Sequence, residues 1–255
     1  MKDVENQKRE KNKIAFFLPN IFTALNLACG FACIIHSWKG QYYSAGMFLV
    51  LGAIFDSVDG RVARLLGVES SFGEQFDSMS DVVSFGVAPA FLVYNRFFVE
   101  LGRLGMVVSF IYLLCTALRL ARFNANHDRV SSNFFQGLPS PAAAFGLIGY
   151  VFFSLEFPDT TLWPVLSISY VVFYSLLMIS NIPFCSFKDS PWVRTHKRFV
   201  LSIIFMTGAL GFMYEELMIG VLISTYVLGS LIYLYKRPDL SKEVFTWEHE
   251  SEIEE

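Results

Sequence analysis

The chain has 255 residues, of which 54% are hydrophobic and only 17% charged, and its formal net charge is −3. This composition is more apolar than that of ordinary soluble domains. Transmembrane strands do not fit either, because the apolar runs lack two-residue alternation and are longer than a strand needs. The composition therefore predicts an all-α protein, a polytopic bundle of transmembrane helices.

Eight hydrophobic segments follow one another along the chain, most of them long enough to cross about 30 Å of hydrocarbon as a helix. They lie near 14–37, 42–66, 75–99, 104–123, 138–157, 161–184, 198–213 and 217–236. We therefore expect about eight transmembrane helices in one domain, 14–236. A basic segment, 1–13, precedes this domain, and an acidic tail, 237–255, follows it.

Positive charges are distributed unequally between the two sides of the predicted membrane domain. If the amino terminus is cytoplasmic, only Lys39, Arg96 and Arg103 of the 20 lysines and arginines fall on the far side. Cytoplasmic loops of helical membrane proteins carry an excess of Lys and Arg. We therefore expect both termini, including segment 1–13 and tail 237–255, on the cytoplasmic side of a cell or inner membrane.

Four aspartates interrupt the second and third apolar segments. Asp56 and Asp59 lie three positions apart, and Asp77 and Asp81 lie four positions apart, so each pair shares one face of a helix. An ionised carboxylate costs several kcal/mol in hydrocarbon unless it is paired. Two such helices side by side would bring four carboxylates together, and this charge attracts divalent cations. The spacing predicts a catalytic metal site at the edge of the membrane.

The aspartates belong to a longer pattern, D-x2-D-G-x2-A-R-x8-G-x3-D-x3-D. Its fixed positions are Asp56, Asp59, Gly60, Ala63, Arg64, Gly73, Asp77 and Asp81. The pattern resembles the signature of the CDP-alcohol phosphatidyltransferases, integral membrane enzymes of phospholipid synthesis, and matches it at all eight positions over 26 residues. Such a match is far more specific than a lone glycine motif.

The non-acidic residues of the pattern fit an anionic nucleotide lipid. Two divalent cations would offset the repulsion between the carboxylates and a pyrophosphate. Gly60 and Ala63 would let a nucleotide approach the helix closely, and Arg64 can donate to a phosphate oxygen. Gly73 would keep the entrance of the third helix clear. For Arg64, a membrane-interface anchor is the alternative.

The family resemblance also implies individual roles. The first three aspartates would be metal ligands, whereas Asp81 would bind the second metal ion and act as general base on the incoming hydroxyl. The residues implied for CDP-diacylglycerol binding are Asn20, Thr23, Asp59, Gly60, Ala63, Arg64, Ser70 and Gly73. For Asn20 and Thr23, a polar helix start near Pro19 is an equally good reading. An all-oxygen site favours two Mg²⁺ or Mn²⁺ ions over Zn²⁺.

Further stretches resemble the branch of the family that uses serine as its acceptor. They are LPNIFTALNLACG (18–30), SFGEQFDSMSDVVSFGVAPA (71–90), ALRLARFN (117–124) and QGLPSPAAA (136–144). Arg119 and Arg122 lie three positions apart on one helix face, and such a pair suits the carboxylate of L-serine. The same pair would suit a phosphate-bearing acceptor, and anchoring at the interface is a third reading.

The leading interpretation is an enzyme that transfers the phosphatidyl group of CDP-diacylglycerol to L-serine, giving phosphatidylserine and CMP. Glycerol phosphate or inositol phosphate as acceptor is the alternative within the family. A cation-coupled transporter with an aspartate relay is the alternative from another class, but a relay needs no glycine, alanine and arginine at fixed offsets. A non-catalytic scaffold does not explain the four carboxylates. The resemblance implies a homodimer in membrane lipid, and no nucleic-acid partner is expected.

Overall fold

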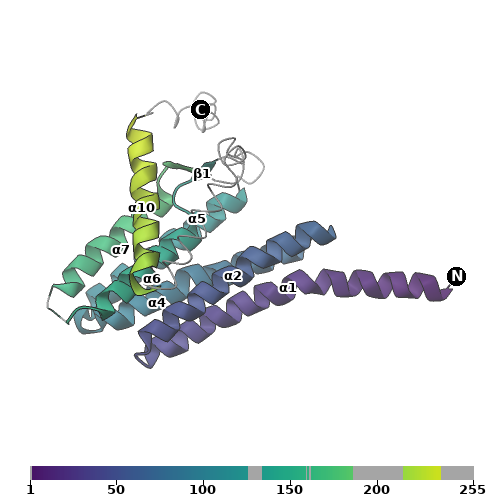
Figure 1. The fold of residues 1–255 in the computed structure, drawn as a ribbon, viewed down its shortest axis with the longest axis horizontal. Helices are drawn as coiled ribbons and strands as arrows, with labels where there is room; N and C mark the ends of the chain where they lie inside the picture. Colours follow the sequence, from purple (N-terminus) through teal and green to yellow (C-terminus); the bar gives the residue numbers. More distant parts are fainter. Residues whose placement is uncertain (1, 126–133, 159, 161, 186–214, 237–255) are drawn as a thin grey trace. The chain divides into compact units, whose positions relative to one another are not determined.

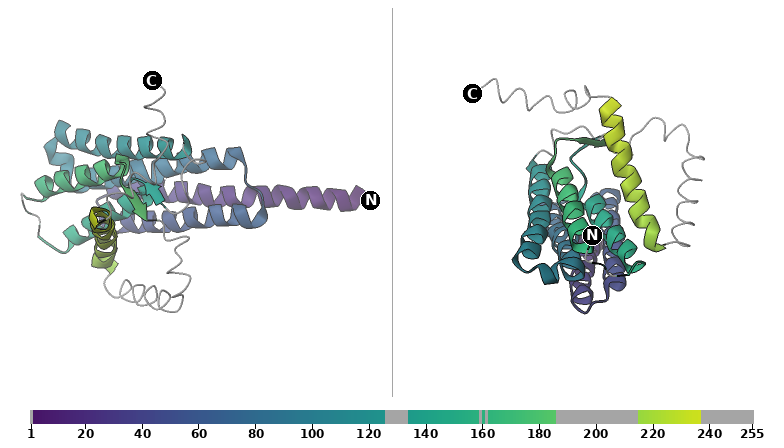
Figure 2. Two further views of the ribbon diagram at one scale, coloured as in Figure 1. Left: turned by 90° about the horizontal axis from the view of Figure 1, so that it is seen from above. Right: turned by 90° about the vertical axis from the view of Figure 1, so that its left-hand side faces the viewer.

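The computed structural model describes residues 2–125, 134–158, 160, 162–185 and 215–236. Helices make up most of these residues, as Figures 1 and 2 show. The predicted helical class is therefore confirmed. The chain forms two compact units, Met1–Ser109 and Phe110–Glu255.

The first unit contains three α-helices and one long, locally modified helical stretch. Its elements are α1 (Lys2–Trp38), α2 (Tyr42–Leu66), α3 (Ser71–Asp81), the π-helix η1 (Val82–Val87), α4 (Ala88–Val93), the π-helix η2 (Tyr94–Phe98) and the 3-10 helix η3 (Val99–Leu101). Helix α5 (Arg103–Ala125) crosses the boundary between the two units. The second unit also contains β1 (Phe134–Gln136), α6 (Ser140–Leu155), α7 (Trp163–Ile179), β2 (Pro183–Cys185) and α10 (Glu215–Lys236).

Small residues bring the helices of the first unit into close contact. A Cβ atom added at Gly30 of α1 would lie 2.7 Å from Ser84 Oγ of η1, and one added at Gly52 of α2 would lie 3.1 Å from Asn26 Oδ1 of α1. The hydroxyl of Ser84 also donates to the carbonyl oxygen of Asn26 at 3.1 Å. Close packing of small residues and hydrogen bonds between helices are what stabilise helix pairs in a membrane.

A tight turn joins α2 to α3. Gly67 ends α2 in the left-handed conformation, φ 62°, and the N–H of Val68 donates to Ala63 O at 3.1 Å. This geometry favours glycine because a Cβ is strained there. Ser70 then caps α3, since its Oγ accepts a hydrogen bond from the N–H of Gly73 at 3.1 Å. The turn therefore reverses the chain between the two aspartate pairs.

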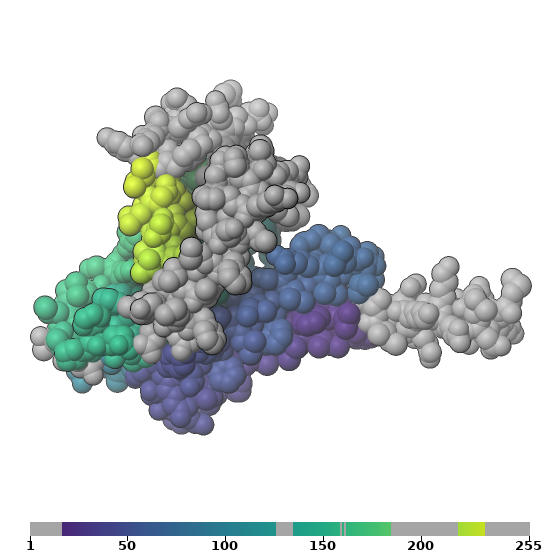
Figure 3. Space-filling model, viewed as in Figure 1, coloured from purple at the N-terminus to yellow at the C-terminus, as the bar shows by residue number. Residues whose placement is uncertain are grey.

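Three helical stretches are long and apolar enough to cross a membrane, namely Phe17–Trp38, Ser71–Leu101 and Arg103–Ala125. Large apolar side chains are exposed along them and along α2, including Ile21 and Ile54, and part of the surface of α1 and α2 is visible in purple and blue in Figure 3. These helices indicate an integral membrane protein. The predicted segment 198–213 lies outside the described residues, so the number of eight spans and the cytoplasmic termini stay predictions.

The second unit contains one short ladder that was not predicted from the sequence. Strands β1 and β2 pair antiparallel, with Phe135 opposite Phe184. Each strand has only three residues, which is too few for a two-residue alternation to stand out. Elsewhere in this unit α6 and α10 pack with their backbones in contact at Gly149 and Gly220, where an added Cβ would collide with the facing glycine.

Candidate functional site

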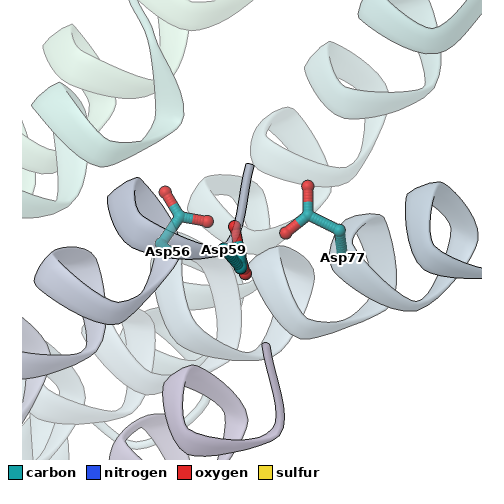
Figure 4. Close-up of side chains that lie close together, drawn as sticks. All are labelled: Asp56, Asp59 and Asp77. Carbon is teal, nitrogen blue, oxygen red and sulfur yellow. The ribbon is translucent and has the colours of Figure 1, made fainter. Parts of the chain in front are cut away.

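Three carboxyl groups from two helices meet in the first unit. Ligand atoms of Asp56, Asp59 and Asp77 all lie within 4.8 Å of one another. Figure 4 shows the carboxyl groups of Asp56 and Asp77 on either side of Asp59. Because the two aspartates of α2 lie three positions apart, both reach the same side of that helix, which faces Asp77 of α3.

The fourth aspartate adjoins this cluster. The carboxyl group of Asp81, one helical turn beyond Asp77, is a hydrogen-bond partner of Asp56. The side-chain N–H of Asn26 on α1 also donates to Asp81 Oδ1, at 3.5 Å. Two carboxyl groups at this separation cannot both carry an uncompensated charge, so a proton or a cation must lie between them.

The chemistry of the cluster fits a divalent cation. Asp77 Oδ1 is buried and has no hydrogen-bond partner among the described residues, although a buried carboxylate oxygen normally has one. The ligand set is made of carboxylate oxygens alone, which Mg²⁺ and Mn²⁺ prefer. The residues present could therefore hold such an ion.

Asp59 is oriented by hydrogen bonds from two directions. Thr23 Oγ1 of α1 donates to Asp59 Oδ2 at 2.8 Å, and the backbone N–H of Gly60 donates to Asp59 Oδ1. Both side chains are buried, Thr23 at 3% exposed and Asp59 at 5% exposed. The hydroxyl of Ser80 donates in turn to the carbonyl oxygen of Thr23 at 3.2 Å. Thr23 is thus tied to both aspartate-bearing helices.

This support predicts the effect of removing one hydroxyl. We expect Thr23→Val, which keeps the volume of the side chain, to weaken Mn²⁺ affinity by roughly 10- to 100-fold, as loss of a group that orients a ligand usually does. Thr23→Ser keeps the donor and serves as the matched control, with affinity near that of the wild type. Calorimetric titration of purified protein measures both. Equal affinity in Thr23→Val and wild type would show that Thr23 does not orient a metal ligand.

Three residues predicted to bind the donor lie together at the start of α3. A Cβ added at Gly73 would lie 3.2 Å from Ser70 Oγ and 3.5 Å from Asn20 Oδ1 of α1. The hydroxyl of Ser70 already accepts from the N–H of Gly73 as a helix cap. Asn20 and Thr23 lie well inside α1, because this helix begins at Lys2, so the alternative of a helix start near Pro19 is wrong.

The surface beside Gly60 is open except for one cation. A Cβ added at Gly60 would meet only Arg64, with Nη1 at 3.6 Å and Nη2 at 3.9 Å. Arg64 is exposed, whereas Ala63 beside it is half-buried. Arg64 is also close enough to Asp59 for an attractive electrostatic interaction. A guanidinium over a glycine next to the carboxylates suits a phosphate group.

The two arginines predicted to bind serine have different surroundings in the second unit. Arg119 is buried, and its Nη1 donates to Ser140 Oγ at 2.6 Å. Arg122 is bound instead to the end of α7 and to β1. Its acceptors are Ile179 O, Asn181 Oδ1, Gln136 O, Met178 O and Ser180 O. The structure therefore separates two residues that share one predicted role.

Asn26 is a site residue that the sequence reasoning missed. Its side chain is fully buried, contacts Asp81, and keeps an Oδ1 without a hydrogen-bond partner among the described residues. The available signal was the recurrence of Asn20, Thr23 and Asn26 at every third position of an apolar segment. The π-helix η1 was missed as well, although it begins directly after Asp81. Such local widening of a helix occurs frequently at functional sites.

Comparison with known proteins agrees with the sequence resemblance. Residues 16–221 match the CDP-alcohol phosphatidyltransferase family. A CDP-diacylglycerol–serine O-phosphatidyltransferase of Helicobacter pylori is 36% identical over 195 residues, which are 75% of this chain and 81% of that protein. The enzyme of the same name from Mycobacterium leprae is 33% identical over 239 residues, 91% of this chain and 79% of the relative. An archaetidylserine synthase of Methanothermobacter thermautotrophicus is 36% identical over 182 residues, 70% of this chain and 73% of the relative.

Proposed function

Because the chain belongs to the CDP-alcohol phosphatidyltransferase family, we propose that it transfers the phosphatidyl group of CDP-diacylglycerol to the hydroxyl of L-serine, giving phosphatidylserine and CMP. The cluster of Asp56, Asp59 and Asp77 is the observation that carries this proposal. Support for serine as the acceptor comes from the relatives named above, two of which act on serine by name.

The aspartates would hold two divalent cations, Mg²⁺ or Mn²⁺, with Asp81 as a ligand of the second. When bound, these cations would supply the positive charge that stabilises the reacting phosphate and the departing CMP. Arg64 would donate to a phosphate oxygen of the donor beside Gly60 and Ala63. Asn20, Ser70 and Gly73 would line its approach at the start of α3.

Asp81 is the general base in this proposal. Its carboxylate takes the proton of the serine hydroxyl while the serine oxygen bonds to the phosphorus that carries diacylglycerol. The bond from that phosphorus to the CMP oxygen breaks, and CMP leaves. The hydrogen bond from Asn26 to Asp81 supports this role, because a base must be held in a fixed orientation.

The carboxylate of serine calls for a cation, and we assign this task to the Arg119 and Arg122 region, with Arg119 as the stronger candidate. Its buried guanidinium, fixed by Ser140, would form a charge-assisted hydrogen bond. The site would open to the cytoplasm, where serine is dissolved. The homodimer implied by the family resemblance stays a prediction.

A CMP-release assay tests the acceptor. Purified protein with Mn²⁺ or Mg²⁺ and CDP-diacylglycerol is expected to release CMP with L-serine and to label lipid from labelled serine. Glycerol phosphate and inositol phosphate serve as matched acceptors and are expected to give background release. Release with one of these two and none with serine would refute the serine assignment but keep the family chemistry. No release with any acceptor would refute the enzyme itself.

A further inference from the structure

We propose that Arg122 is a positioning residue that caps α7 and fixes segment 134–140, so that recognition of an acceptor carboxylate falls to Arg119 alone. The proposal deepens the serine site and rests on the proposed function for that part. It separates two arginines that lie three positions apart on one helix and that the sequence treats as equivalent.

The carboxyl end of α7 is the first observation. A helix leaves its last carbonyl oxygens without partners inside the helix, and a positive side chain is favourable there. The Leu176 and Leu177 oxygens accept from the N–H of Ser180 and of Leu138, both at 3.0 Å. The next three oxygens, on Met178, Ile179 and Ser180, accept from Arg122 at 3.1, 2.9 and 3.2 Å. One guanidinium therefore supplies partners for three successive carbonyl groups.

The hydrogen-bonding capacity of Arg122 is the second observation. Each terminal nitrogen of a guanidinium carries two N–H groups. Nη1 donates to Ile179 O and to Asn181 Oδ1, at 2.9 and 3.1 Å. Nη2 donates to Gln136 O at 2.9 Å besides its bonds to the end of α7. A bidentate bond to a substrate carboxylate would therefore require Arg122 to give up several of its bonds within the protein.

Gly137 makes this arrangement possible. It has a left-handed φ of 76°, and a Cβ added there would lie 2.8 Å from Arg122 Nη2 and 2.9 Å from Ser180 O, and would collide with Met178 O. The N–H of Gly137 donates to Ile182 O at 2.9 Å. Both the conformation and the space therefore require glycine, so that β1 can lie against the guanidinium.

The capped segment leads directly to Arg119. Leu138 is fully buried and is bound through its N–H to Leu177 O. Two residues later, fully buried Ser140 begins α6 and accepts from Arg119 Nη1 at 2.6 Å. Arg122 thus fixes the backbone that carries the hydroxyl partner of Arg119. Loss of the cap should loosen Arg119 although no ligand of serine has been removed.

Arg122→Gln and Gly137→Ala test the inference, because Gly137→Ala removes no charge. Each is expected to lower the melting temperature of the detergent-purified protein by about 5 °C or more and to raise the KM for serine on the order of 10-fold. The double variant is expected to be little worse than either single one, since both disrupt the same contact. Arg122→Lys keeps the charge but cannot make the forked contacts, so intermediate losses are expected. If it unfolds less readily than Arg122→Gln, it also provides a second soluble variant.

Serine itself distinguishes a capping residue from a ligand. Saturating serine should still raise the melting temperature of Arg122→Gln, because a ligand that binds the folded protein stabilises it. Arg119→Gln should lose this increase. The proposal is overturned if Arg122→Gln keeps the wild-type melting temperature but loses the serine-induced increase, or if Gly137→Ala leaves both quantities unchanged. If the wild type shows no serine-dependent release of CMP but both variants lose stability non-additively, the proposed function fails and the capping role stands.

Discussion

Replacing Asp81 with asparagine lowers the turnover number for serine-dependent CMP release by about 10²- to 10⁴-fold, the usual contribution of a positioned general base. Asparagine has nearly the same shape and can still hydrogen-bond to Asn26, but it cannot take up the hydroxyl proton. The affinity for CDP-diacylglycerol is expected to stay near that of the wild type. Initial rates at saturating substrates and a separate donor-binding titration measure the two quantities.

Glu74→Gln is the matched control for this change. Glu74 is an exposed carboxylate on α3, the helix that ends at Asp81. Its neutralisation changes the charge of the helix by the same amount without touching the cluster, so turnover should change by less than about 2-fold, as for most surface substitutions. A turnover loss in Glu74→Gln as large as that in Asp81→Asn would assign the effect to helix charge and not to a base.

Asp59→Ala is expected to abolish metal-dependent donor binding and, with it, activity. Asp59 is the buried aspartate of the cluster, and both of its oxygens are engaged by Thr23 and Gly60. Its removal takes away a carboxylate and leaves a buried hydroxyl and N–H without their acceptor, which also costs about 1–3 kcal/mol of stability. Titration of the donor with and without Mn²⁺, together with thermal unfolding, measures both consequences.

Chelation of the wild-type protein provides the comparison for Asp59→Ala. Excess EDTA should reproduce the loss of donor binding without the loss of stability that comes from the unsatisfied Thr23 hydroxyl. Asp81→Asn should differ from both, since it keeps donor binding and loses turnover. Similar loss of donor binding in Asp59→Ala and Asp81→Asn would contradict a separate base role for Asp81.

The sequence predicted the helical class and the aspartate faces well because both depend on local periodicity. Aspartates three or four positions apart must share a helix face, and the contact of Asp56, Asp59 and Asp77 follows once the two helices are neighbours. The same reasoning gave Arg119 and Arg122 one role. Their different partners, Ser140 and the end of α7, come from segments 18 or more positions away in the chain and left no local signal.

What the sequence determined by itself is the chemistry of the four aspartates and the apolar helices that carry them. Their cost in hydrocarbon and their fixed spacing require a common, compensated site. Only the tertiary structure decided which groups orient that chemistry. Thr23 on Asp59, Asn26 on Asp81 and Arg122 on the carbonyl groups of α7 are contacts between separate elements. A buried polar group must find a partner, but which partner it finds depends on how the helices pack.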